Sequence, residues 1–361
     1  MKALILAGGF GTRLRPLSCT RPKILFPIVN KPLLQWTFER LVKNNVTEAI
    51  LAVNYQTEIL IKQHKIPKCG IHIVYSRDPP RKPLGTGGPI KKAESFIGYD
   101  SPFLVLNGDI FADVNYKEIL KVHKKKDAIA TIALHSAKDP SRYGVAELTK
   151  KNRIKSFIEK PPRKAVVTDL INAGVYVLSP RIFKYISKNH AVSIEREVFP
   201  KLTKEGKLYG YVFNGLWMDI GESEEYLEIN RTLLNSFNPQ RYKIGSKAKT
   251  KEPVAFDKGV TIGEKSVIGP CVVLGRNVTV GKNVHLEDSV VFPRTSISDC
   301  ASIKGAIIGE GVIIGRGVTI GRGCILGDYV RLRDNISLAS GVAICPAKEV
   351  SGNVLKPKRI I

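Results

Sequence analysis

Glycines recur every six residues in the last third of the chain, and this period limits the fold more than any other feature of the sequence. They stand at Gly263, Gly269, Gly275 and Gly281, and again at Gly309, Gly315, Gly321 and Gly327. An aliphatic residue precedes each glycine, as in VTIGEK and VIIGRG. This hexapeptide pattern predicts a left-handed parallel β-helix whose coils bury the aliphatic residue against the coil below.

The repeat has one break in its period. The step from Gly281 to Gly309 is not a multiple of six residues, so one coil between them should carry an irregularity. Counting from Val260 to about Ala343, we expect about four to five three-sided turns of β-helix.

The first 235 residues have a different pattern, in which short β-rich runs alternate with amphipathic stretches of helical length. The β-rich runs include KALILA, EAILAV and FLVLN, and the helical stretches include LLQWTFERLVKNN. This alternation predicts an α/β domain with a mostly parallel, Rossmann-like sheet and a ligand crevice at the carboxyl ends of its strands. We therefore expect an α/β domain over 1–235, a polar linker over 236–250 and the hexapeptide β-helix over 251–361.

A glycine-rich turn follows the first predicted strand, with the sequence GGFGTR from Gly8 to Arg13. It is not a dinucleotide fingerprint, because Leu14 occupies the place of the third glycine, and it lacks the Gly-Lys-Ser/Thr of a P-loop. Glycine permits close approach of a ligand to the backbone, and Arg13 and Lys23 supply positive charge. The turn therefore predicts a binding loop for an anionic ligand, although an ordinary strand-to-helix turn has the same local pattern.

The net charge of +25 is spread along the chain. The segment 1–235 contains 38 basic and 22 acidic residues, and the segment 236–361 contains 19 basic and 10 acidic residues. A generally basic surface favours anionic substrates and argues against a nucleic-acid partner. No apolar run approaches the roughly 20 residues of a membrane span, and the first apolar stretch ends at Gly8, so we expect no membrane partner and a cytoplasmic location.

Six cysteines are scattered without a C-x-x-C pair or a histidine at metal-ligand spacing. They are Cys19, Cys69, Cys271, Cys300, Cys324 and Cys345. This spacing argues against a structural zinc site, and reduced packing cysteines are expected instead. The sequence also lacks the G-x-S-x-G motif that would indicate a nucleophilic serine.

Several motifs occur in an order that resembles the sugar-1-phosphate nucleotidyltransferases. They are GGFGTRLRPL, PLGTGGP at 83–89, LNGD ending at Asp109, FIEKP at 157–161, INAGVYVLSP at 171–180, SIEREVFP at 193–200, WMDIG at 217–221 and the terminal PKRII. The resemblance covers essentially the whole chain and is strongest to the guanylyltransferases of that family. It implies transfer of a nucleotidyl group from GTP to mannose 1-phosphate, giving GDP-mannose and pyrophosphate.

The family reaction is an in-line attack by a sugar-phosphate oxygen on the α-phosphorus of the nucleotide. Because the attacking phosphate is already anionic, the site must supply positioning and charge neutralisation, and no protein nucleophile is needed. The resemblance implies that Arg13 and Lys23 are the catalytic cations on the triphosphate. It implies Asp109 and Asp219 as ligands of Mg²⁺, a hard cation that suits carboxylate oxygens.

The remaining site residues implied by the resemblance bind the two substrates. The nucleotide-binding set is Gly8, Gly9, Gly11, Thr12, Gly85 and Asp109, and the sugar-phosphate-binding set is Gly144, Glu159, Lys160 and Asn172. For Glu159 and Lys160 the alternative is an exposed charged loop end before Pro161, and for Gly85 it is a turn glycine.

One departure from the family pattern bears on the nucleotide. Ile24 follows Lys23 where guanylyltransferases often have proline, and TRPK is also found in thymidylyl- and uridylyltransferase relatives. The Gly88-Pro89 pair and the PKRII terminus point back to the guanylyl group. A glucose-1-phosphate thymidylyl- or uridylyltransferase therefore stays open as an alternative, as does a non-catalytic regulatory homologue that binds a nucleotide sugar.

The repeat region has no cluster of acids, histidines or cations comparable to the N-terminal set. Hexapeptide β-helices also house acyltransferases, but His285 alone is a weak basis for such a site, and a surface histidine explains it better. We expect the β-helix to assemble a homo-oligomer through its flat sides without contributing catalytic groups.

Overall fold

The computed structural model describes residues 1–9, 11–79, 83–188, 190–236 and 248–361. They form two compact units. The first contains Met1–Gly9 and Leu34–Asp219, and the second contains Phe10–Leu33 and Ile220–Ile361. The second unit therefore joins a short N-terminal segment to the C-terminal part of the chain. The boundaries proposed from the sequence stay predictions, and most of the linker at 236–250 lies outside the described residues.

Among the described residues of the first unit, nine strands form one mixed sheet. They are β1 (Lys2–Leu6), β4 (Glu48–Val53), β5 (His72–Arg77), β6 (Phe103–Asn107), β8 (Ala130–Ser136), β9 (Gly144–Leu148), β10 (Ile154–Glu159), β11 (Leu170–Leu178) and β12 (Leu208–Val212). The strand order is β10-β9-β11-β6-β1-β4-β5, and β8 pairs with both β11 and β12. β1 runs parallel to β4 and β6, whereas β11 is antiparallel to β6, β8 and β9. The predicted α/β fold is confirmed, with an antiparallel part that the prediction of a mostly parallel sheet did not include.

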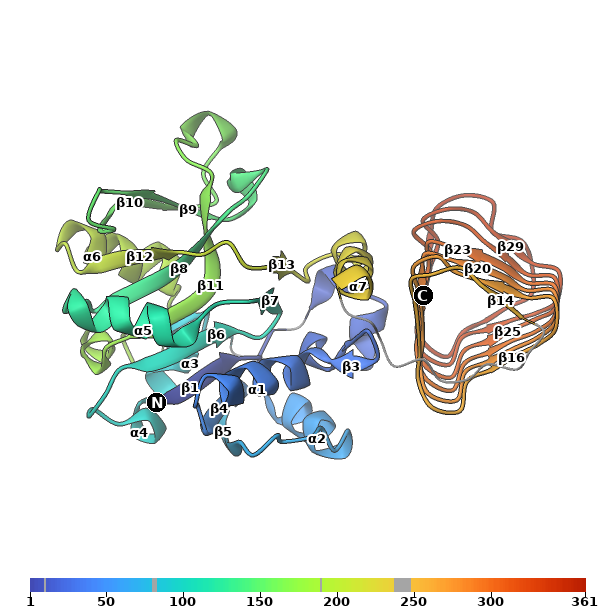
Figure 1. Cartoon of the computed structure of the whole chain (residues 1–361), viewed down its shortest axis with the longest axis horizontal. Coiled ribbons are helices and arrows are strands. Elements are labelled where there is room, and N and C mark those ends of the chain that lie inside the picture. Colours follow the sequence, from blue (N-terminus) through green and yellow to red (C-terminus); the bar gives the residue numbers. More distant parts are fainter. Residues whose placement is uncertain (10, 80–82, 189, 237–247) are drawn as a thin grey trace. The chain divides into compact units, whose positions relative to one another are not determined.

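Helices flank this sheet (Figure 1). They are α1 (Leu33–Lys43), α2 (Tyr55–Gln63), α3 (Gly87–Lys92), α4 (Glu94–Ile97), α5 (Tyr116–Lys125) and α6 (Phe199–Lys204), which follows a π-helical turn at Ile194–Val198. α2 begins where the Asn54 side chain accepts a hydrogen bond from Thr57 N at 2.8 Å, and Asn115 caps α5 in the same way. Within the described ranges, no helix has both the length and the apolar character needed to cross a membrane.

A short antiparallel pair lies beyond the end of β6. It consists of β7 (Ile110–Ala112) and β13 (Trp217–Asp219), with Trp217 opposite Ala112 and Asp219 opposite Ile110. The pair joins the residues just after β6 to residues near the end of the first unit.

The second unit contains stacked coils of very short strands, which give the triangular outline in Figure 1. One sheet holds β14 (Lys249–Thr250), β17 (Val267–Ile268), β20 (His285–Glu287), β23 (Ser302–Lys304), β26 (Thr319–Ile320) and β29 (Ser337–Leu338). The next holds β15 (Val254–Phe256), β18 (Val272–Leu274), β21 (Ser289–Val291), β24 (Ile307–Ile308), β27 (Ile325–Leu326), β30 (Ala343–Ile344) and β32 (Arg359–Ile360). The third holds β16 (Thr261–Ile262), β19 (Thr279–Val280), β22 (Ser296–Ile297), β25 (Ile313–Ile314), β28 (Arg331–Leu332) and β31 (Glu349–Val350).

All the pairs within these three sheets are parallel, which confirms the prediction of a parallel β-helix. The expectation of about four to five turns was too small. Strands β14 and β32 extend the stack to Lys249 and Ile360, beyond the range in which glycines mark the repeat. The count was too small because it ran only from Val260 to about Ala343, and turns beyond that range use residues other than glycine, such as Ala347 with φ +59°.

The break in the glycine period has a structural basis in two short sides of the coils. His285 and Val290 are five residues apart, although their partners in the preceding coil, Val267 and Val273, are six apart. The side from Ser302 to Ile307 is shortened in the same way. The predicted irregularity is therefore present, spread over two adjacent coils instead of one.

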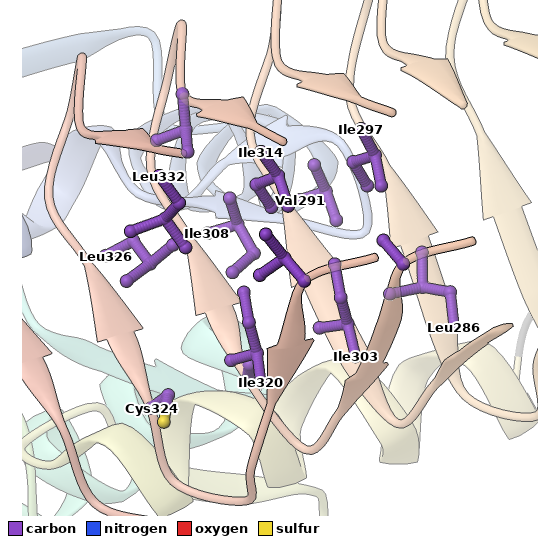
Figure 2. Packing of buried hydrophobic residues seen from close by; sticks show 14 of the residues in the cluster. Leu286, Val291, Ile297, Ile303, Ile308, Ile314, Ile320, Cys324, Leu326 and Leu332 are labelled. Carbon is purple, nitrogen blue, oxygen red and sulfur yellow. The ribbon is translucent and has the colours of Figure 1, made fainter. Parts of the chain in front are cut away.

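The inward side chains of the coils stack in three columns (Figure 2). Ile297, Ile314 and Leu332 form one column in the third sheet, and Val291, Ile308 and Leu326 form another in the second. Each of these side chains is at most 2 % exposed. Since every coil buries its aliphatic residues on its neighbours, the stack is a continuous apolar core.

The other described segments of the second unit are short turns and one long helix. They are the 3₁₀ turns Thr12–Leu14, Leu17–Cys19 and Lys23–Leu25, the strands β2 (Pro27–Ile28) and β3 (Lys31–Pro32), and the helix α7 (Ser223–Ser236).

We predict that Ile320→Ala lowers the free energy of unfolding of the β-helix by about 2–5 kcal/mol, because it leaves a cavity in a dry stack. Ile320 is 1 % exposed. The neighbouring Thr319 is exposed on the same strand, so Thr319→Ala is the matched control and should cost less than about 1 kcal/mol. Chemical unfolding followed by circular dichroism measures both, and equal losses would contradict the inward assignment of Ile320.

Candidate functional site

Asp109 and Asp219, the two metal ligands implied by the sequence, lie close together in the first unit. Asp109 lies two residues after the end of β6, and Asp219 ends β13 opposite Ile110. Both aspartates are partly buried. No three His, Cys, Asp or Glu side chains gather as a possible metal site in the part of the chain that the structure describes. Two carboxylates nevertheless fit a hard divalent cation that completes its shell with substrate phosphate and water.

Asn107 lies two residues before Asp109 and was not singled out from the sequence. Its Oδ1 atom is buried and has no hydrogen-bond partner among the described residues. Gly174 in β11 packs against it, since a Cβ at Gly174 would lie 2.7 Å from Asn107 Nδ2 and 2.3 Å from Ile110 Cδ1. Gly174 also has φ +68°, so only glycine fits here without strain. The arrangement leaves a buried acceptor beside the aspartate pair.

The predicted sugar-phosphate residues Gly144, Glu159 and Lys160 form a second group. Glu159 in β10 pairs with Gly144 in β9, and a Cβ at Gly144 would lie 2.7 Å from Glu159 Oε2. Lys160 N donates to Tyr143 O at 3.0 Å, and the Lys160 side chain is exposed. Burial raises the pKa of Glu159, and the negative charge of Glu195 raises it further. The group places a desolvated carboxyl beside an exposed ammonium.

Glu195 is the centre of a hydrogen-bond network that the sequence analysis did not assign. It lies in the π-helical turn and is 8 % exposed. Thr86 Oγ1 donates to it at 2.5 Å, Ser193 Oγ at 2.9 Å and Tyr176 Oη at 3.3 Å. The predicted sugar-site residue Asn172 joins the network, because its Nδ2 donates to Tyr176 Oη at 2.9 Å.

Burial raises the pKa of Tyr176 well above its ordinary value, and the charge of Glu195 acts in the same direction. The phenol therefore stays protonated and can donate to Glu195. The signal in the sequence was the SIEREVFP run, although nothing in the run itself shows that its first glutamate is buried.

Gly85 lies against the segment that leads into the Glu195 turn. Its φ is +69°, and a Cβ there would lie 2.4 Å from Val192 O. The adjacent backbone is fixed by Val192 N donating to Leu84 O at 3.0 Å and Gly87 N donating to Val192 O at 2.8 Å. Position 85 therefore requires glycine, because its φ is positive and the Val192 backbone leaves no room for a Cβ.

Gly8 lies two residues after the end of β1, in contact with a carboxyl group that sequence reasoning also missed. A Cβ at Gly8 would lie 2.8 Å from Asp78 Oδ2. Asp78 Oδ1 is buried without a hydrogen-bond partner among the described residues. Burial raises the pKa of Asp78 to about 6, although the charge of Lys92 acts in the opposite direction. Gly9 is exposed, and a Cβ there would meet nothing within 4 Å.

The other predicted nucleotide residues belong to the second unit. Gly11 has φ +60°, and a Cβ there would lie 3.1 Å from Lys23 Cγ, so the stem of the lysine passes beside the glycine turn. Ser18 Oγ donates to Gly11 O at 2.7 Å and holds the turn. Thr12 and Arg13 are exposed, whereas Lys23 is 8 % exposed.

The structure thus brings three sets of predicted residues together. They are Asp109 with Asp219, Gly144 with Glu159 and Lys160, and Gly11 with Lys23. Gly85 and Asn172 both adjoin the Glu195 network, because Thr86 follows Gly85 and Asn172 joins through Tyr176, whereas Gly8 lies beside Asp78.

Comparisons with known proteins agree with an α/β part followed by a β-helix. Residues 2–236 match the family described as nucleotidyl transferase, and residues 250–360 match the family described as GMPPB C-terminal domain. A rice protein named probable mannose-1-phosphate guanylyltransferase 1 is 39% identical over 276 residues, which is 75% of each chain. The Arabidopsis thaliana mannose-1-phosphate guanylyltransferase 1 is 39% identical over 274 residues, also 75% of each chain.

Solved structures with a similar fold include HddC from Yersinia pseudotuberculosis, which was also solved in complex with GMP-PN. The HddC chain is 30% identical, with a TM-score of 0.55 over 64% of this chain and 99% of that one. A UDP-glucose pyrophosphorylase complexed with UDP-glucose has a TM-score of 0.58 over 65% of this chain and 99% of that one. At 24% identity, this second likeness shows the fold alone. Enzymes of the nucleotidyl transferase family generally use a divalent metal.

We predict that Asp78→Asn stabilises the protein at pH 8 and changes its stability little at pH 4. A carboxyl whose pKa is raised to about 6 in the fold stabilises it while protonated, and this contribution is lost as the pH rises through 6. Because Asp78 is only partly buried, we expect a gain of about 1–2 kcal/mol at pH 8. Chemical unfolding at both pH values tests this, with Asp100→Asn at an exposed position as the control. An equal difference at both pH values would show that the charge of Asp78 is not responsible.

Proposed function

Because the chain belongs to the nucleotidyl transferase family, we propose that it transfers the guanylyl group of GTP to mannose 1-phosphate and releases pyrophosphate. The relatives named mannose-1-phosphate guanylyltransferase, which match three quarters of the chain, support this choice of substrates. The observation that carries the proposal is the β7–β13 pair, in which Asp219 lies opposite the residue that follows Asp109. Two carboxylates held in this way suit a metal-bound triphosphate.

In this proposal the reaction needs no protein nucleophile, since a phosphate oxygen of the sugar 1-phosphate attacks the α-phosphorus. Arg13 and Lys23 bind the triphosphate and stabilise the negative charge that grows on the departing pyrophosphate. Asp109 and Asp219 would hold Mg²⁺, which when bound neutralises phosphate charge. Gly8, Gly9, Gly11 and Thr12 let the nucleotide approach the backbone closely.

Asp78 favours guanine as the base in this proposal. Its buried Oδ1 lacks a hydrogen-bond donor among the described residues, at the point where β1 enters the glycine turn. The N1–H and N2 amino groups of guanine are neighbouring donors that one carboxylate can accept together. Gly85, whose backbone conformation is fixed, is assigned to the same base.

For the sugar phosphate, we assign Glu159 and Asn172 to hydroxyl groups and Lys160 to the phosphate. The raised pKa of Glu159 reflects a desolvated carboxyl, which accepts sugar hydroxyls more strongly than a solvated one. Gly144 lets Glu159 Oε2 and the Phe157 ring pack directly against the backbone, because a Cβ there would lie 2.7 Å from each. Glu195 orients Asn172 through Tyr176.

The proposed function is tested by a matrix of nucleoside triphosphates against sugar 1-phosphates, read by pyrophosphate release. ATP, GTP, CTP, UTP and dTTP are each paired with mannose, glucose and galactose 1-phosphates, and ITP is added because it lacks the guanine amino group. We expect the highest turnover with GTP and mannose 1-phosphate, and a weaker response to ITP. Highest turnover with UTP or dTTP and glucose 1-phosphate would replace the proposed substrates, and no turnover in any pair would support a regulatory homologue.

We predict that Asp109→Asn and Asp219→Asn each lower turnover by about two or more orders of magnitude and leave the fold intact, because each removes an anionic metal ligand. Steady-state rates at saturating Mg²⁺ measure the effect. Asp113→Asn is the matched control, since Asp113 follows β7 and is exposed. A near-normal rate in either aspartate variant would remove that residue from the metal site.

We predict that Lys160→Ala raises the KM for the sugar phosphate about 10-fold or more, with little change in the KM for GTP, because the lost ammonium contacts one substrate only. Lys164→Ala is the control, as Lys164 is an exposed lysine of the following turn. Initial rates with each substrate varied in turn separate the two constants. If the KM values for GTP and for the sugar phosphate rise equally, Lys160 does not contact the sugar phosphate alone, and the assignment is wrong.

A further inference from the structure

One outer face of the β-helix is apolar and buried. It belongs to the sheet that contains β18, β21, β24 and β27, where the outward residues Val273, Val290, Ile307 and Ile325 are at most 8 % exposed. The outward positions of the third sheet differ, as Thr279 and Ile313 are exposed. Within the second unit, two segments contact this face.

Contacts within the second unit identify the cover as α7 and the N-terminal segment. α7 packs on β21, and Asn30 Nδ2 donates to Leu274 O at 3.0 Å. The Phe26 ring packs edge-on against Phe292, with centroids 6.2 Å apart, and against Tyr226 of α7 at 5.7 Å. The coils therefore hold the segment that carries the triphosphate lysine.

Arg21 links that segment to the coils through its side chain. It is 8 % exposed, and its guanidinium donates to Glu310 Oε2 and, at 2.8 Å, to Asp328 Oδ2. Thr20 Oγ1 donates to the same Asp328 oxygen at 2.7 Å, and Asp328 Oδ1 accepts from Glu310 N at 2.8 Å. The guanidinium also lies over the Phe292 ring, 5.0 Å from its centroid. Two carboxylates of the β-helix thus fix one arginine of the N-terminal segment.

Lys23 follows Arg21 by two residues, through a stiff connection. Pro22 fixes the backbone between them, and the turn Lys23–Leu25 is closed by Leu25 N donating to Pro22 O at 2.9 Å. Phe26 N donates to Lys23 O at 2.9 Å. A displacement of the Arg21 backbone would therefore move Lys23 and change its contact with Gly11.

We propose that Arg21 is a positioning residue for Lys23, and that Glu310 and Asp328 of the β-helix set the place of the lysine through it. The β-helix then contributes to catalysis by holding the triphosphate-binding segment, in addition to any role in assembly. The inference rests on the proposed function, because it takes Lys23 as the lysine that binds the triphosphate.

Single substitutions in this network would leave a buried charge without a partner and could unfold the segment. The informative variant is the triple change Arg21→Met, Glu310→Gln and Asp328→Asn, which removes the charges of these three side chains and keeps their volumes similar. Arg294, which also donates to Glu310, keeps its charge and is exposed to solvent. We expect its melting temperature to stay close to that of the unchanged protein. We expect kcat/KM for GTP to fall about 10- to 100-fold, as for a small displacement of a catalytic group, with the KM for mannose 1-phosphate unchanged.

A double-mutant cycle with Lys23→Ala separates positioning from general stability. If Arg21 acts through Lys23, the triple change lowers kcat/KM in the unchanged background and has almost no effect once Lys23 is alanine. The control is Arg333→Met with Glu349→Gln, which removes an exposed ion pair elsewhere in the coils and should leave kcat/KM unchanged.

Equal losses in both backgrounds, or unchanged kcat/KM in the stable triple variant, would overturn the positioning role and leave the proposed function intact. Normal turnover in Lys23→Ala alone would overturn the positioning role and the assigned role of Lys23 together. A conservative Arg21→Lys variant supplies a second test, since it keeps the positive charge and loses the planar guanidinium group that can contact both carboxylates. It should lower kcat/KM for GTP less than the triple change does.

Discussion

The aliphatic residue before each hexapeptide glycine is buried only when the next coil covers it, and the rest of the second unit depends on this stacking. The stack orders its outer faces as well as its core, because neighbouring strands repeat the same outward positions. Where those positions are apolar, the face binds α7 and the segment around Phe26. The coil stack thereby supports the segment that carries Lys23, the proposed triphosphate-binding lysine.

The periodic features could be predicted from the sequence, and the long-range contacts could not. The glycine period predicted the parallel β-helix, since each hexapeptide repeats the same local packing. It gave too few turns, because the end strands at Lys249 and Ile360 pair without the glycine signal. The attachment of Arg21 to Asp328 had no sequence signal, because a salt bridge between distant residues depends on how the two segments pack. A sheet that is antiparallel around β11 was likewise not visible in the alternation of strands and helices.

The site residues differ in the same way, because motifs predict some of them and only the packing reveals the others. Motif order gave Asp109, Asp219 and Glu159 as candidates, and the structure adds buried polar groups to them. Asp78 and Asn107 each keep a buried oxygen without a partner among the described residues, a property of the fold that no motif reveals. Such groups cost stability unless a ligand supplies the missing hydrogen bond, which is why we treat them as candidates for ligand contacts.

Backbone hydrogen exchange of the segment around Lys23 tests most directly whether the β-helix holds it. In the full-length protein, we expect the amides of Leu25 and Phe26, which donate within the turn, to be protected to a degree similar to those of coil strands such as β24. In the triple variant of Arg21, Glu310 and Asp328, their exchange should accelerate while that of β24 stays unchanged. Exchange of Leu25 and Phe26 as fast as in the exposed turn at Lys150–Lys151 of the unchanged protein, with β24 protected, would contradict the account.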